Sequence, residues 1–244
     1  DEIGRVGNEF IRGVEENEKL TTNLYKSLYQ EKESELIALQ SQINPHFLYN
    51  ALDSIFWMAE EHNAPDISHM TVALSNMFKL SLNNGEKLIT IRKELEMVQS
   101  YITIQKVRFE DRIRVITSVE EGILDLKIVK FILQPLVENS VIHGLEGKKG
   151  MGFLWIGGKK QGDNLLITIK DNGVGLTREE TEQIFTAGNQ KGVHYNKVGV
   201  KNVQERIQLL YGEQYGLSFE SREYTLVKVI LPFEKEPVME DIKD

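Results

Sequence analysis

The spacing of apolar residues changes near residue 110, and this change limits the possible folds more than any other feature of the chain. Before it, apolar residues recur every three or four positions, as at Ile3, Val6 and Phe10, which is the spacing of one helix face. After it, stretches such as 112–119 alternate apolar and polar residues, as a half-buried β-strand does. The pattern predicts an α+β chain, with a helical first part and a second part that combines helices with a sheet.

In the first part we expect helices separated by two breaks. A turn at 63–65 ends the helix that precedes it, and Asp66 is expected to cap the next helix, which runs to about Leu82. Gly85 is expected near the C-cap of that helix. A further helix is expected at 92–109.

In the second part we expect two β-hairpins and several helices. The expected elements are a long helix at 127–144 with Pro135 inside it, a hairpin at 153–173, a short helix at 178–185, a polar loop at 186–197, a helix at 198–211 and a hairpin at 217–233.

The composition excludes several classes of function. The chain has 244 residues and no cysteine, so disulfides, thiolate metal sites and cysteine nucleophiles are excluded. The formal net charge is -8 and no run is rich in lysine or arginine, so we expect no nucleic-acid partner. No apolar run approaches the roughly 18 residues that span a bilayer, and the acidic, polar start is not a signal peptide. Because the first residue is Asp1 and not methionine, we expect a piece of a longer protein.

The motif LVENSVIHG, residues 136–144, lies on an expected helix and carries three polar side chains of interest. The amide oxygen of Asn139 is a ligand type that Mg²⁺ accepts. Glu138 and His143 flank it. Taken alone, the motif is equally compatible with an ordinary amphipathic helix.

The motif KDNGVGL, residues 170–176, directly follows an expected strand. The carboxylate of Asp171 is suited to accept a hydrogen bond from an adenine amino group. Gly173 and Gly175 allow the backbone to approach a flat ring or a phosphate. The alternative is a plain turn, since Asn-Gly is a common hairpin signal.

The motif KVGVKNVQER, residues 197–206, places Gly199 where a loop meets a helix. Free amide groups at a helix N-terminus form a site for anions. The alternative is a glycine that only eases the start of the helix.

The order and spacing of these three motifs resemble those of the ATP-binding domain shared by gyrase, Hsp90, histidine kinases and MutL, the GHKL or Bergerat fold. The resemblance implies an α/β sandwich that binds ATP and Mg²⁺, with Asn139 as the metal ligand and Asp171 as the adenine contact. The residues that it assigns to cofactor binding are Asn139, His143, Asp171, Gly173, Gly175, Lys197, Gly199 and Asn202.

The same resemblance implies that 186–197 forms a lid over ATP. Lys191, Lys197 or His194 is expected to contact phosphate, and the motifs do not decide between them. Residues 184–185 are a candidate for the F box of the family.

The stretch QINPHFLYNALDSI resembles the histidine box of the LytS/YesM-type sensor histidine kinases, and the resemblance continues through 91–112. It implies that His46 accepts a phosphoryl group, that two helices of each subunit of a homodimer form a four-helix bundle, and that a response-regulator aspartate receives the group. Pro45 is expected to free the carbonyl of Ser41 and to bend the helix next to His46. The sequence leaves open whether phosphorylation occurs in cis or in trans.

One position departs from the larger histidine-kinase families, in which an acidic residue follows the histidine. Here that position is Phe47, so the general base is open, and Glu138 is our candidate. Asn50 lies one helical turn after His46 and is a candidate to orient water for dephosphorylation of the regulator. A hydrogen bond between bundle helices is an equal alternative for Asn50.

The start of the chain, DEIGRVGNEFIRGVEE, resembles the end of a HAMP linker. This implies a membrane receptor whose cytoplasmic portion is this chain. The resemblance to the LytS/YesM-type kinases implies an AraC- or LytTR-type regulator as partner. The expected divisions are a HAMP remnant and signalling helix at 1–30, a dimerisation and phosphotransfer domain at 31–110, the ATP-binding domain at 111–235 and a tail at 236–244.

Two alternatives to a histidine kinase remain: a GHKL-type ATPase clamp or chaperone, and a non-catalytic dimeric scaffold.

Overall fold

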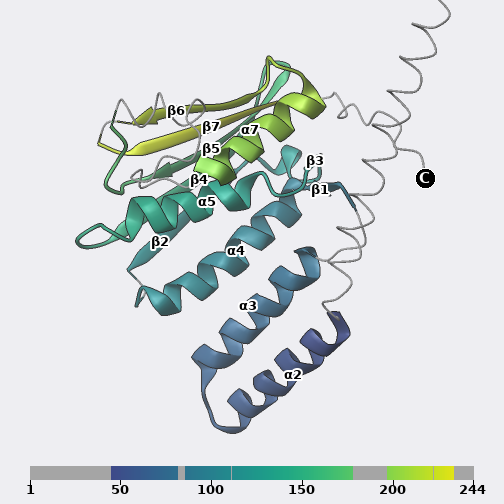
Figure 1. Cartoon of the computed structure of the whole chain (residues 1–244), viewed down its shortest axis with the longest axis vertical. Helices are drawn as coiled ribbons and strands as arrows, with labels where there is room; N and C mark the ends of the chain where they lie inside the picture. The colour runs from purple at the N-terminus through teal and green to yellow at the C-terminus, as the bar shows by residue number, and fades with distance from the viewer. Residues whose placement is uncertain (1–44, 82–85, 111, 178–196, 222, 234–244) are drawn as a thin grey trace, which may run out of the picture. The chain divides into compact units, whose positions relative to one another are not determined.

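The computed structural model describes residues 45–81, 86–110, 112–177, 197–221 and 223–233 (Figure 1). The chain divides into two units, 1–51 and 52–244. The expected HAMP remnant, Gly85, the helix at 178–185, the candidate F box and most of the expected lid lie outside the described residues.

The helices and strands follow one another as the change of periodicity predicts. The helices are α2 (Pro45–Glu61), α3 (Pro65–Ser81), α4 (Ile91–Arg108), the 3-10 helix η1 (Glu121–Ile123), α5 (Leu133–Asn139), the π-helix η2 (Ser140–Leu145) and α7 (Lys197–Tyr211). The strands are β1 (Leu88–Thr90), β2 (Ile113–Val119), β3 (Lys127–Val129), β4 (Gly152–Gln161), β5 (Asn164–Asp171), β6 (Gly216–Ser221) and β7 (Thr225–Pro232).

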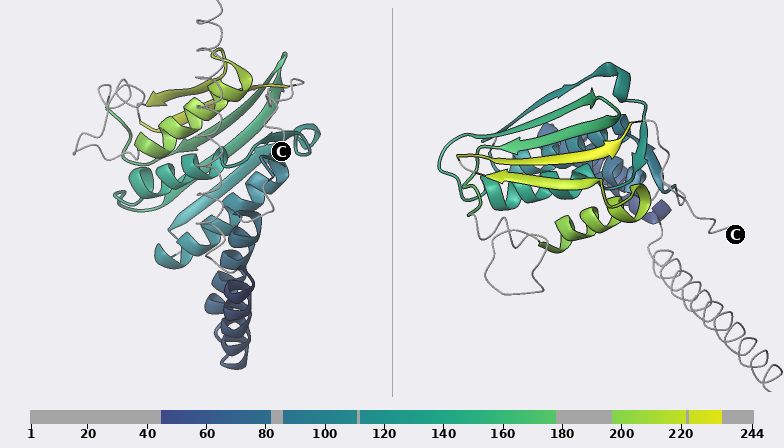
Figure 2. Two further views of the ribbon diagram at one scale, coloured as in Figure 1. Left: turned by 45° about the vertical axis from the view of Figure 1, so that its right-hand side comes forward. Right: turned by 90° about the horizontal axis from the view of Figure 1, so that it is seen from above.

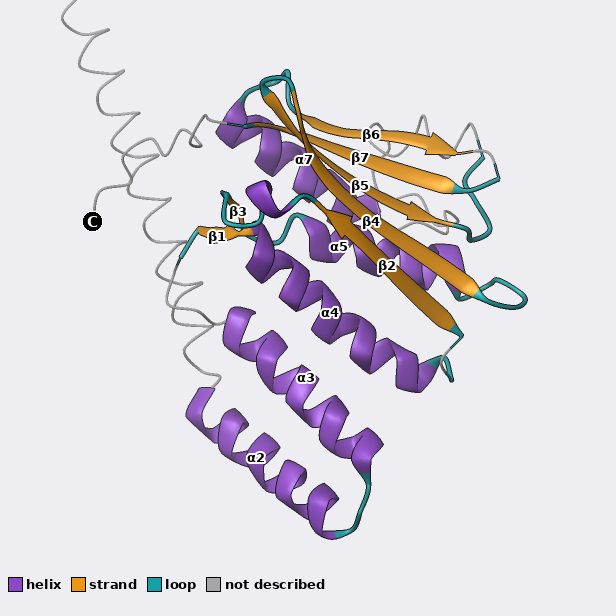
Figure 3. Cartoon of the chain, turned by 180° about the vertical axis from the view of Figure 1, so that it is seen from behind, coloured by secondary structure: helices purple, strands orange, loops and turns teal. Residues whose placement is uncertain are grey.

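The main sheet has five strands in the order β2-β4-β5-β7-β6. Strands β2 and β4 are parallel, and the other neighbours are antiparallel. Helices α4, α5 and α7 cover one face of this sheet (Figures 2 and 3). The two predicted hairpins, β4-β5 and β6-β7, are confirmed. The expected α+β class is therefore confirmed, with a mixed sheet behind a layer of helices.

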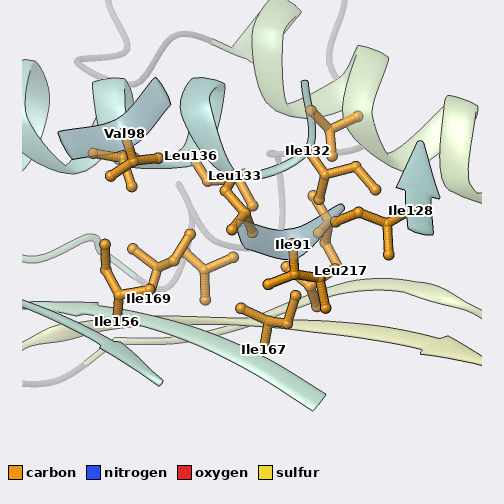
Figure 4. Packing of buried hydrophobic residues seen from close by; sticks show 14 of the residues in the cluster. Ile91, Val98, Ile128, Ile132, Leu133, Leu136, Ile156, Ile167, Ile169 and Leu217 are labelled. Atoms are coloured by element: carbon orange, nitrogen blue, oxygen red, sulfur yellow. The ribbon is translucent and has the colours of Figure 1, made fainter. Parts of the chain in front are cut away.

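The hydrophobic core lies between the sheet and its helices (Figure 4). Ile156 and Ile169 of the sheet and Val98 and Leu136 of the helices are each no more than 2% exposed. Burying a side chain of this size contributes about 1.5–3 kcal/mol to folding. Because Val98 belongs to α4, the core continues across residue 110, where a domain boundary is expected; the domain limits stay a prediction.

The expected long helix at 127–144 was wrong in part. Residues 127–129 form strand β3, which pairs with β1, and the helix α5 begins only at Leu133. Pro135 is the third residue of α5, where the amide that proline lacks has no partner within the helix in any case. After Asn139 the helix widens into the π-helix η2.

The break between α2 and α3 lies where the sequence predicts it. Asn63 has a left-handed backbone, with φ of 50°. The amide of Asn63 donates to the carbonyl of Glu60, and the amide of Ala64 donates to the carbonyl of Ala59. These two bonds satisfy two carbonyls in the last turn of α2. The expected cap at Asp66 was wrong: α3 begins at Pro65, so Asp66 lies inside the first turn.

The predicted helices at 92–109 and 198–211 are confirmed to within one residue at each end, as α4 and α7. The Thr90 side chain caps α4 by accepting the amide of Lys93.

Candidate active site

The carboxyl group of Asp171 ends the buried row of strand β5. Side chains of β5 alternate between core and exterior, so Asp171 falls on the core face two residues after Ile169 and is only 1% exposed. Burial raises the pKa of this carboxyl to about 6. The amide of Gly173, which donates to Oδ1 at 2.9 Å, acts in the opposite direction, as do Ser140 and Lys148. A carboxyl group held this deep is typical of a binding site.

The two expected motifs at 136–144 and 170–176 are packed against each other through glycines. A Cβ on Gly173 would lie 2.2 Å from the carbonyl oxygen of Gly144. A Cβ on Gly144 would lie 2.7 Å from Oδ1 of Asp171. The same Gly144 carbonyl accepts the amide of Val174 at 3.0 Å. No side chain larger than hydrogen fits at either glycine, so this contact requires both.

Asn139 is the last residue of α5 and is 3% exposed. It stands at the entry of the π-helix, in which the amide of Glu146 donates to the carbonyl of Val141, five residues earlier. Such π-turns often occur at functional sites because they shift side chains relative to a regular helix. His143 lies within this π-helix and is half-buried.

The loop after β5 is fixed at both ends. Oδ1 of Asn172 accepts the amide of Phe153 at 2.7 Å, which ties the loop to β4. The amide of Leu176 donates to the Ser221 hydroxyl at 2.7 Å, which ties it to β6. Gly175, between them, has a φ of 77°, a left-handed conformation that favours glycine. The sequence predicts a role in ligand binding for Gly173 and Gly175 but assigns no role to Asn172.

The third motif opens helix α7. Lys197 and Gly199 are its first and third residues, so their amides belong to the turn that has no acceptor within the helix. Asn202 follows one turn later and is exposed. Lys191 and His194, the other expected phosphate contacts, lie outside the described residues.

The expected phosphoacceptor, His46, lies on helix α2 in the first part of the chain. His46 is its second residue and is exposed, and Phe47 beside it is 72% exposed. The amide nitrogen of Asn50 lies 3.4 Å from Nδ1 of His46. The described residues begin at Pro45, so the expected bend before His46 stays a prediction.

Glu138, the candidate base, is half-buried on α5, one residue before Asn139. Its carboxylate accepts a hydrogen bond from the Gln134 side chain at 2.8 Å. This bond holds the Glu138 side chain along its own helix.

The described residues contain no group of three or more His, Cys, Asp or Glu side chains that would hold a metal alone. A single amide oxygen, such as that of Asn139, fits Mg²⁺ that takes its remaining ligands from phosphates and water. Among the described helices, none is long and apolar enough to cross a membrane.

Comparison with known families agrees with this geometry. Residues 34–113 match the family model "Histidine kinase", and residues 124–235 match "Histidine kinase-, DNA gyrase B-, and HSP90-like ATPase". The fold and these matches define the class: the chain carries the two domains of an ATP-dependent histidine kinase.

Individual relatives narrow this class. The chain is 35% identical to the sensor histidine kinase YesM of Bacillus subtilis, over 95% of this chain and 38% of YesM. It is 35% identical to the sensor histidine kinase YpdA of Escherichia coli, over 84% of this chain and 35% of YpdA. It is 34% identical to the sensor protein LytS of Oceanobacillus iheyensis, over 83% of this chain and 35% of LytS. The chain belongs to this family of two-component sensor histidine kinases, and it spans little more than a third of the length of these relatives.

Proposed function

We propose that this chain is the part of a sensor histidine kinase that transfers phosphate from ATP to His46 and then to an aspartate of a response regulator. The observation that carries the proposal is the packing of Gly173 on Gly144 beside the buried carboxyl of Asp171. This arrangement brings together two motifs that lie about 30 residues apart in the sequence. It matches the ATP-binding role that the family implies for both.

The described residues fit a bound nucleotide. The Asp171 carboxylate retains acceptor capacity beyond its bond with Gly173, and the adenine amino group is a donor. Gly173 and Gly175 keep the adjoining backbone free of side chains, and the first turn of α7, with Gly199, offers amides for phosphate. Asn139 is our proposed ligand for Mg²⁺, which would neutralise charge on the phosphates.

The chemistry proposed for His46 needs one unprotonated ring nitrogen. As placed, the Asn50 amide nitrogen faces Nδ1 as a donor, which leaves the ring proton on Nε2; we propose that the amide turns its oxygen to Nδ1 for the reaction, so that Nδ1 keeps the proton and Nε2 carries the lone pair. Nε2 then forms the bond to the γ-phosphorus of ATP while the bond to the β–γ bridging oxygen breaks and ADP leaves. The Nδ1 proton is the one that must be removed, and Glu138 is our candidate base.

The homodimer, the regulator and the anchor extend this proposal. Large apolar side chains are exposed on α2 and α3, including Trp57, Met58 and Ile67, as expected for helices that pair with a second copy. We propose an AraC- or LytTR-type regulator as the receiver. We also propose that the full protein is a membrane receptor, with a HAMP segment, of which this chain is the cytoplasmic portion. None of these partners is a nucleic acid.

The test is incubation with γ-³²P-ATP and Mg²⁺. We expect a label that is labile in acid, stable in base and absent from His46→Gln. His62→Gln is the matched control, because His62 is also exposed and directly follows the helix that carries His46. Label that persists in His46→Gln would contradict the assignment of the acceptor.

The alternative within the same superfamily is an ATP-hydrolysing clamp or chaperone. It predicts steady release of phosphate without any labelled protein. Absence of ATP binding would instead favour the non-catalytic scaffold.

A further inference from the structure

The most enclosed acidic side chain among the described residues is Glu94, on helix α4, which is 0% exposed. Its two carboxylate oxygens accept three consecutive backbone amides. The amide of Phe131 donates at 2.6 Å, that of Ile132 at 3.1 Å and that of Leu133 at 2.8 Å. These three amides stand at the amino end of α5, the helix that carries Asn139.

The contact satisfies groups that α5 cannot satisfy by itself. The first amides of a helix have no acceptor within it, and Ile132, at the N-cap, has no side chain that accepts one. The negative charge of Glu94 also interacts favourably with the positive, amino end of the dipole of helix α5. Burial raises the pKa of Glu94, whereas the three amides and Lys130 favour the ionised form.

The backbone at this contact adopts a conformation that needs outside support. Phe131 has a φ of 62°, the left-handed region, which a side chain with a Cβ seldom occupies. Such a conformation persists where its surroundings fix it. The bonds from Glu94 to the amides of Phe131 and of the next two residues supply that constraint.

Neighbouring bonds attach the same short segment to other helices. The Lys130 ammonium donates to the carbonyl of Ser81 at the end of α3, at 3.0 Å. Arg206 of α7 donates to the carbonyl of Lys130 at 2.9 Å. The segment before α5 is therefore the place where α3, α4 and α7 are joined to one another.

Helix α4 is also attached to the far end of the same helical segment. Arg108, the last residue of α4, forms an ion pair with Glu146, which directly follows η2. Both partners of this pair are substantially exposed, so it contributes little. Of these two attachments between α4 and the helical segment, the buried one at Glu94 is therefore the stronger.

We propose that Glu94 is a positioning residue for the nucleotide site: by fixing the amino end of α5 to α4, it sets where Asn139 and Gly144 lie. Helices α5 and η2 run without interruption from Leu133 to Leu145, so a displacement at one end moves the other. Asn139 is six residues, or about 9 Å, along this segment. A shift of α4 relative to α5 thus changes ATP binding. The inference uses only the nucleotide-binding half of the proposed function.

The test compares Glu94→Gln with the matched control Glu96→Gln, two residues further along α4 and exposed. The Kd for ATP is measured by titration calorimetry on the full chain, well below the melting temperature of each variant. Glutamine leaves one acceptor and directs an N–H₂ group at backbone amides, so we expect the Kd to rise about tenfold. We expect no change for Glu96→Gln. Binding needs no phosphoryl transfer, so a failure of the kinase assay does not affect this result.

Amide hydrogen exchange gives the second readout. We expect faster amide exchange at Phe131, Ile132 and Leu133 in Glu94→Gln. In NMR spectra we also expect a changed chemical shift for the Gly144 amide. We expect neither change in Glu96→Gln. A lower melting temperature with an unchanged Kd would overturn the proposal, because it would make Glu94 a purely structural residue. If Glu94→Gln does not fold, Glu94→Asp, which keeps the charge but is shorter, is measured instead, and a wild-type Kd there would also overturn it.

Discussion

The proposed phosphoacceptor and the proposed nucleotide site have opposite surroundings. His46 is exposed on helix α2, and the amide nitrogen of Asn50 lies 3.4 Å from its Nδ1. Asp171 is 1% exposed at the end of a core strand, beneath glycines that leave no room for a Cβ. One residue is accessible from outside, and the other is fixed by packing.

This contrast separates two kinds of mutational effect. A substitution of an exposed side chain removes its chemistry and changes the free energy of folding by no more than about 0.5 kcal/mol. A substitution in the packed site changes the fold and nucleotide binding together. Measuring both quantities for each variant therefore tests whether the two regions differ as described.

The largest combined effect is expected for Gly173→Ala. The new Cβ would meet the backbone of Gly144 at 2.2 Å, and backbone cannot move aside as a flexible side chain does. Overpacking of this kind costs about 1–3 kcal/mol. We expect a lower free energy of unfolding in urea and a loss of measurable ATP binding.

Gly122→Ala is the matched control for this variant. A Cβ at Gly122 would have no neighbour within 4 Å, so we expect wild-type stability and binding. Equal effects of the two substitutions would mean that the contact between Gly173 and Gly144 does not organise the site.

The prediction from sequence was most accurate where local pattern decides the structure. Alternation placed Asp171 at the end of a strand, and helical spacing located α4 and α7 to within one residue. Gly173 and Gly175 were found because their motif is short and contiguous.

The residues that were missed act through contacts between distant segments. Glutamate side chains are usually exposed, and Glu94 lies in a charged helical stretch. Nothing in the local sequence shows that its carboxylate accepts backbone amides 37 to 39 residues away. The role of Gly144 likewise depends on Gly173. The long helix expected at 127–144 was wrong because residues 127–129 gain more from pairing with β1 than from helical continuation. A tertiary partner outweighed local propensity in each case.

Asp171→Asn is expected to have the next largest effect. Loss of a charged acceptor for a buried donor costs about 1.5–3 kcal/mol, or roughly a 10- to 100-fold rise in the Kd for ATP. The wild-type Kd should also rise as the pH falls below about 6, because the Asp171 carboxyl then becomes protonated. The asparagine variant lacks this titration. The Kd of the variant divided by the Kd of wild type should therefore be smaller at pH 5 than at pH 7.

The unliganded stability of the same variant provides an independent check. Folding raises the pKa of Asp171 from 3.8 to about 6, so its stabilising contribution is complete below pH 4 and is lost as the pH rises through 6. At about 1.4 kcal/mol per pKa unit this amounts to about 3 kcal/mol. We expect Asp171→Asn to gain stability relative to wild type between pH 4 and pH 7 in urea titrations. A constant difference over this range would show that Asp171 is not the titrating group.

The smallest effect is expected for Asn50→Ala. The amide of Asn50 is 3.4 Å from Nδ1 of His46, which is long for a hydrogen bond, and both side chains are exposed. A net contribution of about 0.5–1 kcal/mol corresponds to a roughly 2- to 5-fold slower initial rate of His46 labelling, with wild-type ATP binding. Asp53→Ala, exposed on the same helix, is the control. Slower dephosphorylation of the regulator with a normal labelling rate would instead favour a water-orienting role. A lowered melting temperature of the dimer would indicate that Asn50 forms a hydrogen bond across the helical bundle. The region around His46 would then be held by contacts between elements, as the site around Asp171 is.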